Sequence, residues 1–445
     1  MFPPFETKDA RSYCLKLISQ IEAGNIIFKQ ITQDSMERKD NGLMLGTLIC
    51  KEKVLFCVSG IHRQLEVINN PFNFDFVIVP PLADKEAISK ALEQNDRKIH
   101  ELTDKINAGS TNLTEERRKL TDQSLKKVFS LYNFYKSDNT NITLDNIILK
   151  HGGKLPPTGT GDCCAPKLLS YAYEHNYTPL SMDEVFYGKN TKNKINLQSY
   201  PPCPERCDYI LPDILGLDII YRDDYIIVVN KPSMLLSVPG RTPDKQDCIV
   251  NRVKKLYPFC IEQPSVHRLD METSGLMVLA FTKEAHKNLN LQFEKKLVEK
   301  AYTALLDGAL PKSSGELSPH GGKKSGRIEL KFRLDINNRP HQIYDEENGK
   351  LGITEWQLLN IEKYTNPISK KEKTVSRMLY RPLTGRTHQL RLISSDSHGF
   401  NLPIVGDSLY GKCEEGERLM LHCHYLSFIH PVTNEKMEFN LPCPF

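Results

Sequence analysis

Apolar positions change their spacing along the chain, and each spacing predicts a different element. Within residues 1–80, apolar residues three and four apart predict a helix over 11–22. Short apolar runs predict strands over 43–50, 53–59 and 74–79. The sequence therefore predicts a β-rich module at the start of the chain.

A different pattern follows over residues 81–136. Apolar residues recur every three, four or seven positions from 82 to 107, which predicts a long helix. After a break at Gly109, a second helix is expected, with Asn112 as its N-cap and Glu115 three residues later. Two helices joined by a short break predict an antiparallel hairpin. Charges of both signs alternate along it, which favours a solvated arm over an RNA-binding surface.

Residues 137–212 contain a Gly/Pro-rich loop and four grouped cysteines, Cys163, Cys164, Cys203 and Cys207. A helix is expected near Pro166, because proline is favoured in a first turn. Four thiolates can hold a structural zinc ion, but an adjacent pair and a three-residue spacer fit the common zinc ribbons poorly. We favour buried cysteines, keep structural zinc and then a redox pair as alternatives, and assign no metal ligand. Residues 208–218 are expected to form a linker.

The second half, residues 213–445, alternates apolar runs of strand length with short turns. Helices are expected over 246–256 and 283–298, the second with Thr282 as its N-cap. Because strands outnumber helices and return through short turns, an α+β domain with a largely antiparallel mixed sheet flanked by helices is predicted. The expected strands are 226–229, 276–281, 302–306, 328–334, 352–361, 375–381 and 419–428.

Composition narrows the class of protein. The chain has 445 residues, 39% of them hydrophobic and 26% charged, which allows two or three globular domains. It has neither a membrane-length apolar run nor the charge order of a signal peptide, so a cytoplasmic protein is expected. The net charge of +4 is too small to establish a polyanionic partner.

Candidate chemistry lies in the sequence HRLDMETSGL at residues 267–276, directly before an apolar run. The loop holds Asp270 between a rigid strand and solvent, where catalytic groups are often found. Taken alone, Arg268 and Asp270 could form a surface ion pair. The segment resembles the catalytic signature of the RluA family of RNA pseudouridine synthases, and the resemblance spans about residues 217–445. Further blocks in the family's order are 226–232, 237–240, 300–302, 381–391, 403–407 and 419–431.

The resemblance implies a fold and an activity. The fold is the pseudouridine synthase fold, here preceded by an α+β accessory domain with a helical hairpin in place of the S4 domain that many members carry. The activity is isomerisation of specific uridines in 23S-type ribosomal RNA or tRNA, with no metal, redox or nucleotide cofactor. The alternative is an RNA-binding ribosome-assembly factor whose catalysis is incidental. A pure binder has no need of the catalytic residues that the resemblance identifies.

Three residues match the family's catalytic positions. Asp270 is the implied catalytic carboxylate beside C1′ of a flipped-out uridine, where it either adds to C1′ or removes the 2′ proton. Arg386 is implied to hold the charge of this carboxylate. Tyr302 is implied to lie against the uracil and to help remove the C5 proton. For Lys231 and His388, structural roles are favoured over chemical ones.

Other residues are assigned to RNA contacts. By resemblance, Arg268 enters the space that the flipped base leaves, and Leu390 forms an apolar wall under that base. Lys323, Lys324 and Arg327 form a basic cluster suited to RNA phosphates, although a solvated face explains such a run equally well.

Overall fold

The computed structural model describes residues 5–30, 42–203, 205–242, 245–310 and 324–445. The chain forms two compact units, Met1–Leu217 and Asp218–Phe445. In the described residues, no helix has both the length and the apolar character that crossing a membrane requires.

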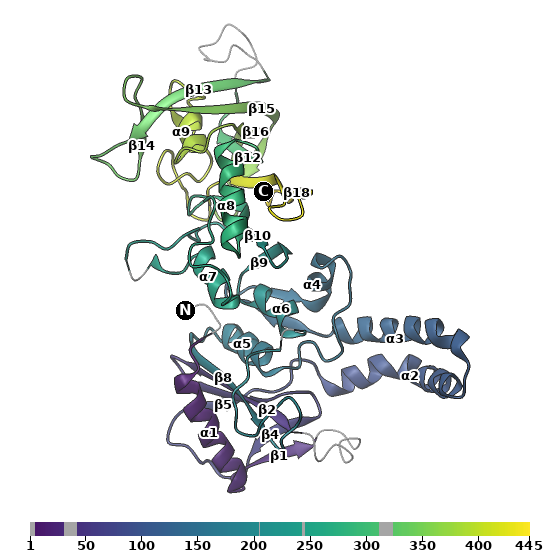
Figure 1. Ribbon diagram of the computed structural model, residues 1–445. Helices are drawn as coiled ribbons and strands as arrows, with labels where there is room; N and C mark the ends of the chain where they lie inside the picture. The colour runs from purple at the N-terminus through teal and green to yellow at the C-terminus, as the bar shows by residue number, and fades with distance from the viewer. Residues whose placement is uncertain (1–4, 31–41, 204, 243–244, 311–323) are drawn as a thin grey trace. The chain divides into compact units, whose positions relative to one another are not determined.

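The first unit contains a four-stranded sheet with a helix on each face (Figure 1). Leu45 lies in the core with Leu17 of the first helix, whereas at the next position, Gly46, a Cβ atom would come within 2.4 Å of Cys164 Cβ. Successive strand residues point to opposite faces, so the two helices cover different sides of the sheet. The strand order is β5 (Phe76–Ile78), β3 (Val54–Val58), β2 (Leu43–Cys50) and β8 (Pro179–Tyr187), with helices α1 (Lys8–Glu22) and α5 (Cys164–Glu174).

Smaller elements complete this unit. They are the pair β1 (Ile26–Gln30) and β4 (Arg63–Val67), the pair β6 (Asn133–Tyr135) and β7 (Asn141–Thr143), and helices α4 (Leu144–Lys150) and α6 (Cys207–Ile214). The linker prediction for 208–218 was wrong over most of its length, because α6 occupies it and buries Ile210 and Ile214. The sequence did not predict this helix because it contains Pro212, and proline is unfavourable inside a helix.

The predicted hairpin is confirmed as helices α2 (Lys85–Asn107) and α3 (Thr114–Phe129), which lie side by side (Figure 1). Lys98 Nζ of α2 lies 2.8 Å from a carboxylate oxygen of Glu116 in α3. Asn112 is not the cap of the second helix. A 3₁₀ turn over Thr111–Leu113 delays the start of α3 and puts Leu113 at the N-cap position.

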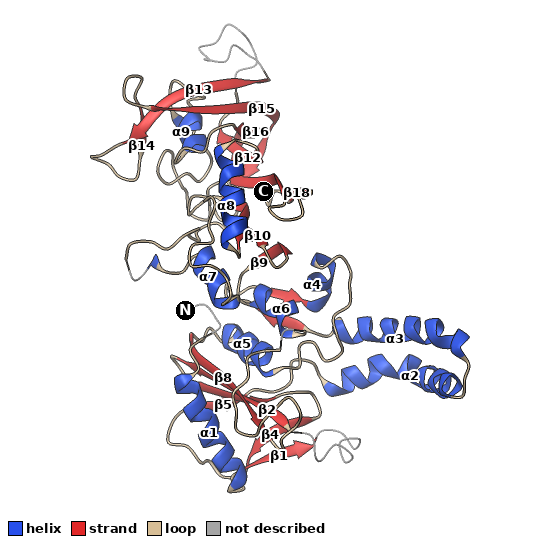
Figure 2. Ribbon diagram, in the orientation of Figure 1, coloured by secondary structure: helices blue, strands red, loops and turns tan. Residues whose placement is uncertain are grey.

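The second unit is built on a ten-stranded sheet, red in Figure 2. All its strand pairs are antiparallel except β11 with β17, which confirms the predicted largely antiparallel mixed sheet. The order is β14 (Gln342–Tyr344), β13 (Ser325–Leu334), β15 (Lys350–Thr365), β16 (Glu372–Pro382), β12 (Glu299–Asp307), β17 (Leu421–Ile429), β11 (Ser274–Ala280), β10 (Ile226–Lys231) and β9 (Asp218–Arg222), while β18 (Lys436–Asn440) pairs with β17.

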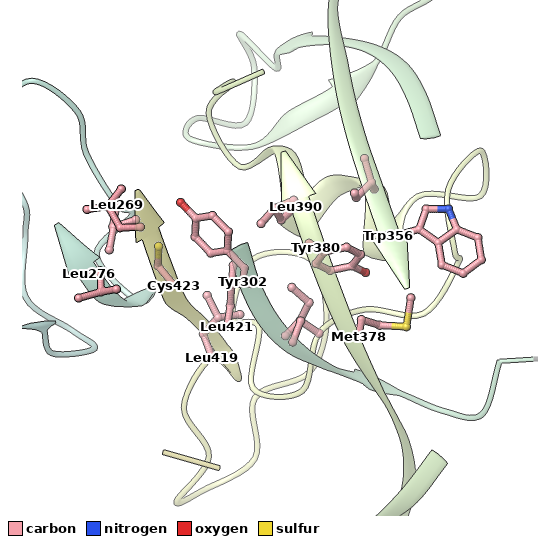
Figure 3. Packing of buried hydrophobic residues seen from close by; sticks show 14 of the residues in the cluster. Leu269, Leu276, Tyr302, Trp356, Met378, Tyr380, Leu390, Leu419, Leu421 and Cys423 are labelled. Carbon is pink, nitrogen blue, oxygen red and sulfur yellow. The ribbon is translucent and has the colours of Figure 1, made fainter. Parts of the chain in front are cut away.

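In the described part of this unit, the sheet is accompanied by helices α7 (Ile249–Leu256), α8 (Lys283–Glu294) and α9 (Gln389–Ser395). The predicted cap of α8 is confirmed, since the Thr282 side chain accepts a hydrogen bond from the backbone N–H of Ala285. The core joins residues from distant strands, among them Leu276, Tyr302, Tyr380 and Leu421 (Figure 3). Tyr302 of β12 stands opposite Tyr380 of β16, so the predicted catalytic tyrosine is fixed in the middle of the sheet.

Candidate active site

One cavity of about 1110 Å³ in the second unit brings most of the predicted site residues together. Lys324, directly before β13, is not among the residues that line it, and Lys323 lies outside the described residues. The predicted residues that do line the cavity are Arg268, Asp270, Tyr302, Arg327, Arg386 and Leu390.

The backbone beside Asp270 is held by the segment that follows β10. The hydroxyl of Ser237 donates to the carbonyl oxygen of Leu269 at 2.6 Å and accepts from the Leu269 N–H at 3.0 Å. Lys231 Nζ donates to the carbonyl oxygen of Met271 at 2.9 Å, and also to two carbonyls of its own segment. Burial lowers the pKa of Lys231 to about 7, against the opposing effect of Asp270. Lys231 thus has the structural role expected for it, and the loop is preorganised.

A buried ion-pair network ties the same loop to α9. Arg391, 2% exposed, donates through Nε and Nη2 to the two carboxylate oxygens of Asp407, at 2.9 and 2.5 Å. Its Nη2 also lies 2.7 Å from a carboxylate oxygen of Glu272, two residues after Asp270. Such two-pronged contacts fix both position and orientation. Burial lowers the pKa of Arg391, but the hydrogen bond and charge of Asp407, followed by the charges of Glu272 and Asp270, raise it overall.

Sequence reasoning missed the Glu272–Arg391–Asp407 network. All three residues stand inside the blocks that carry the family resemblance. None of them lies in a predicted helix or strand, so no local pattern indicated that their charges would be buried and would require partners.

Asp270 is half-buried, and within the described residues its carboxylate makes no hydrogen bond or ion pair. Arg386 is exposed on the loop between β16 and α9, where its Nε lies 3.3 Å from the carbonyl oxygen of Leu351. The two residues line one cavity but do not form an ion pair in the part of the chain described. Arg391, which also lines the cavity, is engaged by Asp407 and Glu272.

Tyr302 presents its ring to the cavity from β12 and is 8% exposed. Burial, followed by Cys423 and Asp270, raises the pKa of Tyr302 well above its ordinary value. The hydroxyl therefore keeps its proton at neutral pH and can donate a hydrogen bond. Leu390 of α9, 7% exposed, belongs to the same apolar cluster and supplies an apolar surface near the ring (Figure 3).

The cavity carries more positive than negative side chains. Seven Lys or Arg and four Asp or Glu are among its lining residues. Arg268 is exposed, whereas Arg327 is half-exposed and lies 2.6 Å from a carboxylate oxygen of Glu329. A cationic surface around a half-buried carboxylate suits a polyanionic substrate whose reaction develops positive charge.

Comparisons with known proteins agree with this geometry. The family described as RNA pseudouridylate synthase matches residues 225–396. The dual-specificity RNA pseudouridine synthase RluA of Vibrio vulnificus is 39% identical over 241 residues, which cover 54% of this chain and 88% of that protein. RluA of Escherichia coli K12 is 36% identical over 243 residues, covering 54% of this chain and 98% of that protein.

Among solved structures, human RNA pseudouridylate synthase domain containing 1 matches at 28% identity with a TM-score of 0.40, covering 52% of this chain and 84% of that one. The bacterial relatives decide the assignment, because the match extends over nearly all of their length. They also favour an enzyme over an assembly factor. The chain belongs to the RluA family of RNA pseudouridine synthases, and its second unit has the pseudouridine synthase fold.

Proposed function

We propose that this enzyme isomerises uridines of ribosomal RNA or tRNA in the cytoplasm, with the target uridine flipped into the cavity around Asp270. The observation that carries the proposal is the state of Asp270. Ser237 and Lys231 fix the backbone of the residues on either side of it, while its carboxylate has no protein partner within the described residues. The name of the relatives, dual-specificity RNA pseudouridine synthase, supports more than one RNA substrate.

The reaction needs a carboxylate at this place. The bond from N1 to C1′ breaks, the uracil turns, C5 joins C1′, and C5 loses a proton while N1 gains one. Positive charge develops on the ribose, and a carboxylate beside C1′ stabilises it as in glycoside hydrolysis. Asp270 therefore acts at the ribose, either by adding to C1′ or by removing the 2′ proton.

The other cavity residues have complementary roles. Arg386 is exposed and free to meet a phosphate or the charge of Asp270 once RNA is bound. Tyr302 and Leu390 enclose the uracil, and the protonated Tyr302 hydroxyl can donate to it. Arg268 fills the gap in the base stack, since a base inside a helix cannot be reached.

Mapping pseudouridine in cellular RNA tests this proposal. Cells that lack the gene receive wild type, Asp270→Asn or Glu284→Gln, the last being an exposed carboxylate on α8 that does not line the cavity. Wild type and Glu284→Gln should restore the same ribosomal or transfer RNA positions, and Asp270→Asn should restore none. Equal restoration by Asp270→Asn would refute the role of this residue. Equal rescue of growth without restored pseudouridine would favour the assembly-factor function.

A further inference from the structure

Three cysteine sulfurs of the first unit converge on one point. The Sγ of Cys203 lies 3.8 Å from the Sγ of Cys163 and 3.8 Å from the Sγ of Cys207. All three sulfurs lie within 4.8 Å of one another. We call Cys163, Cys203 and Cys207 the thiol cluster.

The fourth cysteine of the group in the sequence does not belong to this cluster. The Sγ of Cys164 donates to the carbonyl oxygen of Met44 at 3.4 Å, and its Cβ packs where Gly46 leaves room. Cys163 and Cys164 are adjacent at the start of α5, so their side chains point in different directions. The sequence placed four cysteines in one group, but in the folded chain only three of their sulfurs lie together.

The starts of two helices position the thiol cluster. Cys163 is the N-cap residue of α5 and Cys207 is the first residue of α6. The N–H of Cys207 donates to the carbonyl oxygen of Cys203 at 3.0 Å, which holds Cys203 beside the start of α6. Each helix start therefore fixes the position of one of the three sulfurs.

We propose that Cys163, Cys203 and Cys207 bind one Zn²⁺ ion through three thiolates, with a ligand other than cysteine at the fourth position. Zinc–sulfur bonds of about 2.3 Å in a tetrahedron put sulfurs about 3.8 Å apart. The two sulfur–sulfur separations of 3.8 Å from Cys203 equal that distance. A disulfide needs about 2.05 Å, so neither measured pair is bonded.

Ligand type and burial agree with a single zinc ion. Thiolate ligands select zinc, copper(I) or iron–sulfur clusters, and iron–sulfur clusters are ordinarily held by four cysteines, one more than the thiol cluster contains. Sulfurs within 4.8 Å of one another are spaced for one shared ion. Cys207 is 1% exposed whereas Cys163 and Cys203 are half-buried, so one side of the thiol cluster remains open for the fourth ligand.

The ion would have a structural role in the first unit. It would join residues 40 positions apart in the chain, linking the start of α5 to the segment that leads into α6. A metal that binds the folded unit stabilises it by the free energy of binding. The inference concerns the first unit alone and does not depend on the proposed RNA substrate.

Metal analysis of the full-length protein, purified without chelator and with reducing agent, tests the proposal. Wild type should carry about one zinc per chain, and Cys203→Ser and Cys207→Ser should each retain less than ~0.2. Cys164→Ser is the matched control, an adjacent cysteine outside the thiol cluster, and should keep the zinc of wild type. Zinc retained by Cys203→Ser and Cys207→Ser, or lost equally from Cys164→Ser, would overturn the assignment.

A measurement on wild type alone covers the case in which the serine variants do not fold. Co²⁺ added to the chelator-treated protein should bind one to one and give the intense d–d bands of a tetrahedral ion with thiolate charge-transfer absorption. Absence of these bands in a folded protein would overturn the proposal. So would a chain mass lowered by two hydrogens together with no zinc, which indicates a disulfide within the thiol cluster.

Discussion

The polar groups around Asp270 and the sulfurs of the thiol cluster differ in the hydrogen bonds and ion pairs that they make with other protein groups. In the second unit, Lys231 is buried and donates to three carbonyl oxygens. Arg391 is also buried and forms ion pairs with two carboxylates. Asp270, between them, has no such partner among the described residues. In the first unit, the hydrogen bonds that the three sulfurs make within the described residues are to one another. The comparison teaches that the groups with no protein partner outside their own site are those placed to meet a ligand.

The largest effect on stability is expected when one partner is removed from the buried ion-pair network. Asp407→Asn leaves Arg391 buried with Glu272 alone, and we expect a loss of about 3 kcal/mol in the free energy of unfolding of the second unit. The single tryptophan of the chain, Trp356, is 4% exposed in the core of this unit, so its fluorescence during urea unfolding reports this unit.

The control is an ion pair of the same kind on the surface. Lys436 and Glu438 on β18 are about half-exposed, and Lys436→Gln should lower the unfolding free energy by less than about 1 kcal/mol. If Asp407→Asn is no more destabilising than Lys436→Gln, the buried network does not hold the loop.

A second change affects activity and leaves stability intact. Arg386→Lys keeps the charge but loses the planar guanidinium, and we expect kcat/KM to fall by about 10- to 100-fold. Because Arg386 is exposed, the unfolding midpoint should stay that of wild type. Arg327→Lys, on the same cavity but already paired with Glu329, is the matched control and should change kcat/KM less. Equal activity of Arg386→Lys and wild type would limit Arg386 to a general charge effect.

Sequence reasoning succeeded where local pattern and fold agree. The strands over 43–50 and 226–229 and the Thr282 cap were predictable, because apolar runs and capping residues act through neighbours in the chain. The residues of the cavity came from motif resemblance, since no local rule joins Asp270 to Tyr302 across different strands.

The failures have physical reasons in distant contacts. Strand β8 was missed because Asp183 and Glu184 interrupt its apolar pattern, and its register is set by β2, more than a hundred residues earlier. The thiol cluster depends on α6, a helix that the sequence presented as a linker. Which of two adjacent cysteines joins it is decided by packing at Gly46.

A third change tests whether the hydrogen bonds of Ser237 hold the loop. Ser237→Ala removes both hydrogen bonds to Leu269 at a buried position and should lower the unfolding free energy of the second unit by about 1–3 kcal/mol. Ser397→Ala, at an exposed serine, should leave it unchanged. An equal effect of both variants would show that Ser237 does not fix the loop.

A fourth prediction concerns the dependence of stability on pH. Desolvation, with the nearby Lys300, lowers the pKa of His267 to about 3, so the unfolded chain binds a proton at this residue that the folded chain does not. Stability should therefore fall as pH drops below the ordinary histidine pKa, by up to about 1.4 kcal/mol per pH unit. His267→Gln should reduce the slope of unfolding free energy against pH, whereas His398→Gln, at an exposed histidine, should not. If the slope is unchanged in His267→Gln, His267 is not the source of this pH dependence.

Release of tritium from RNA labelled at uridine C5 tests the central claim most directly, because joining C5 to C1′ must expel that hydrogen. Purified wild type and Asp270→Asn are compared on ribosomal RNA and tRNA separately. The account predicts release by wild type from at least one of the two RNAs, and none by Asp270→Asn at equal protein concentration and equal RNA binding. Release by Asp270→Asn at the rate of wild type would contradict it.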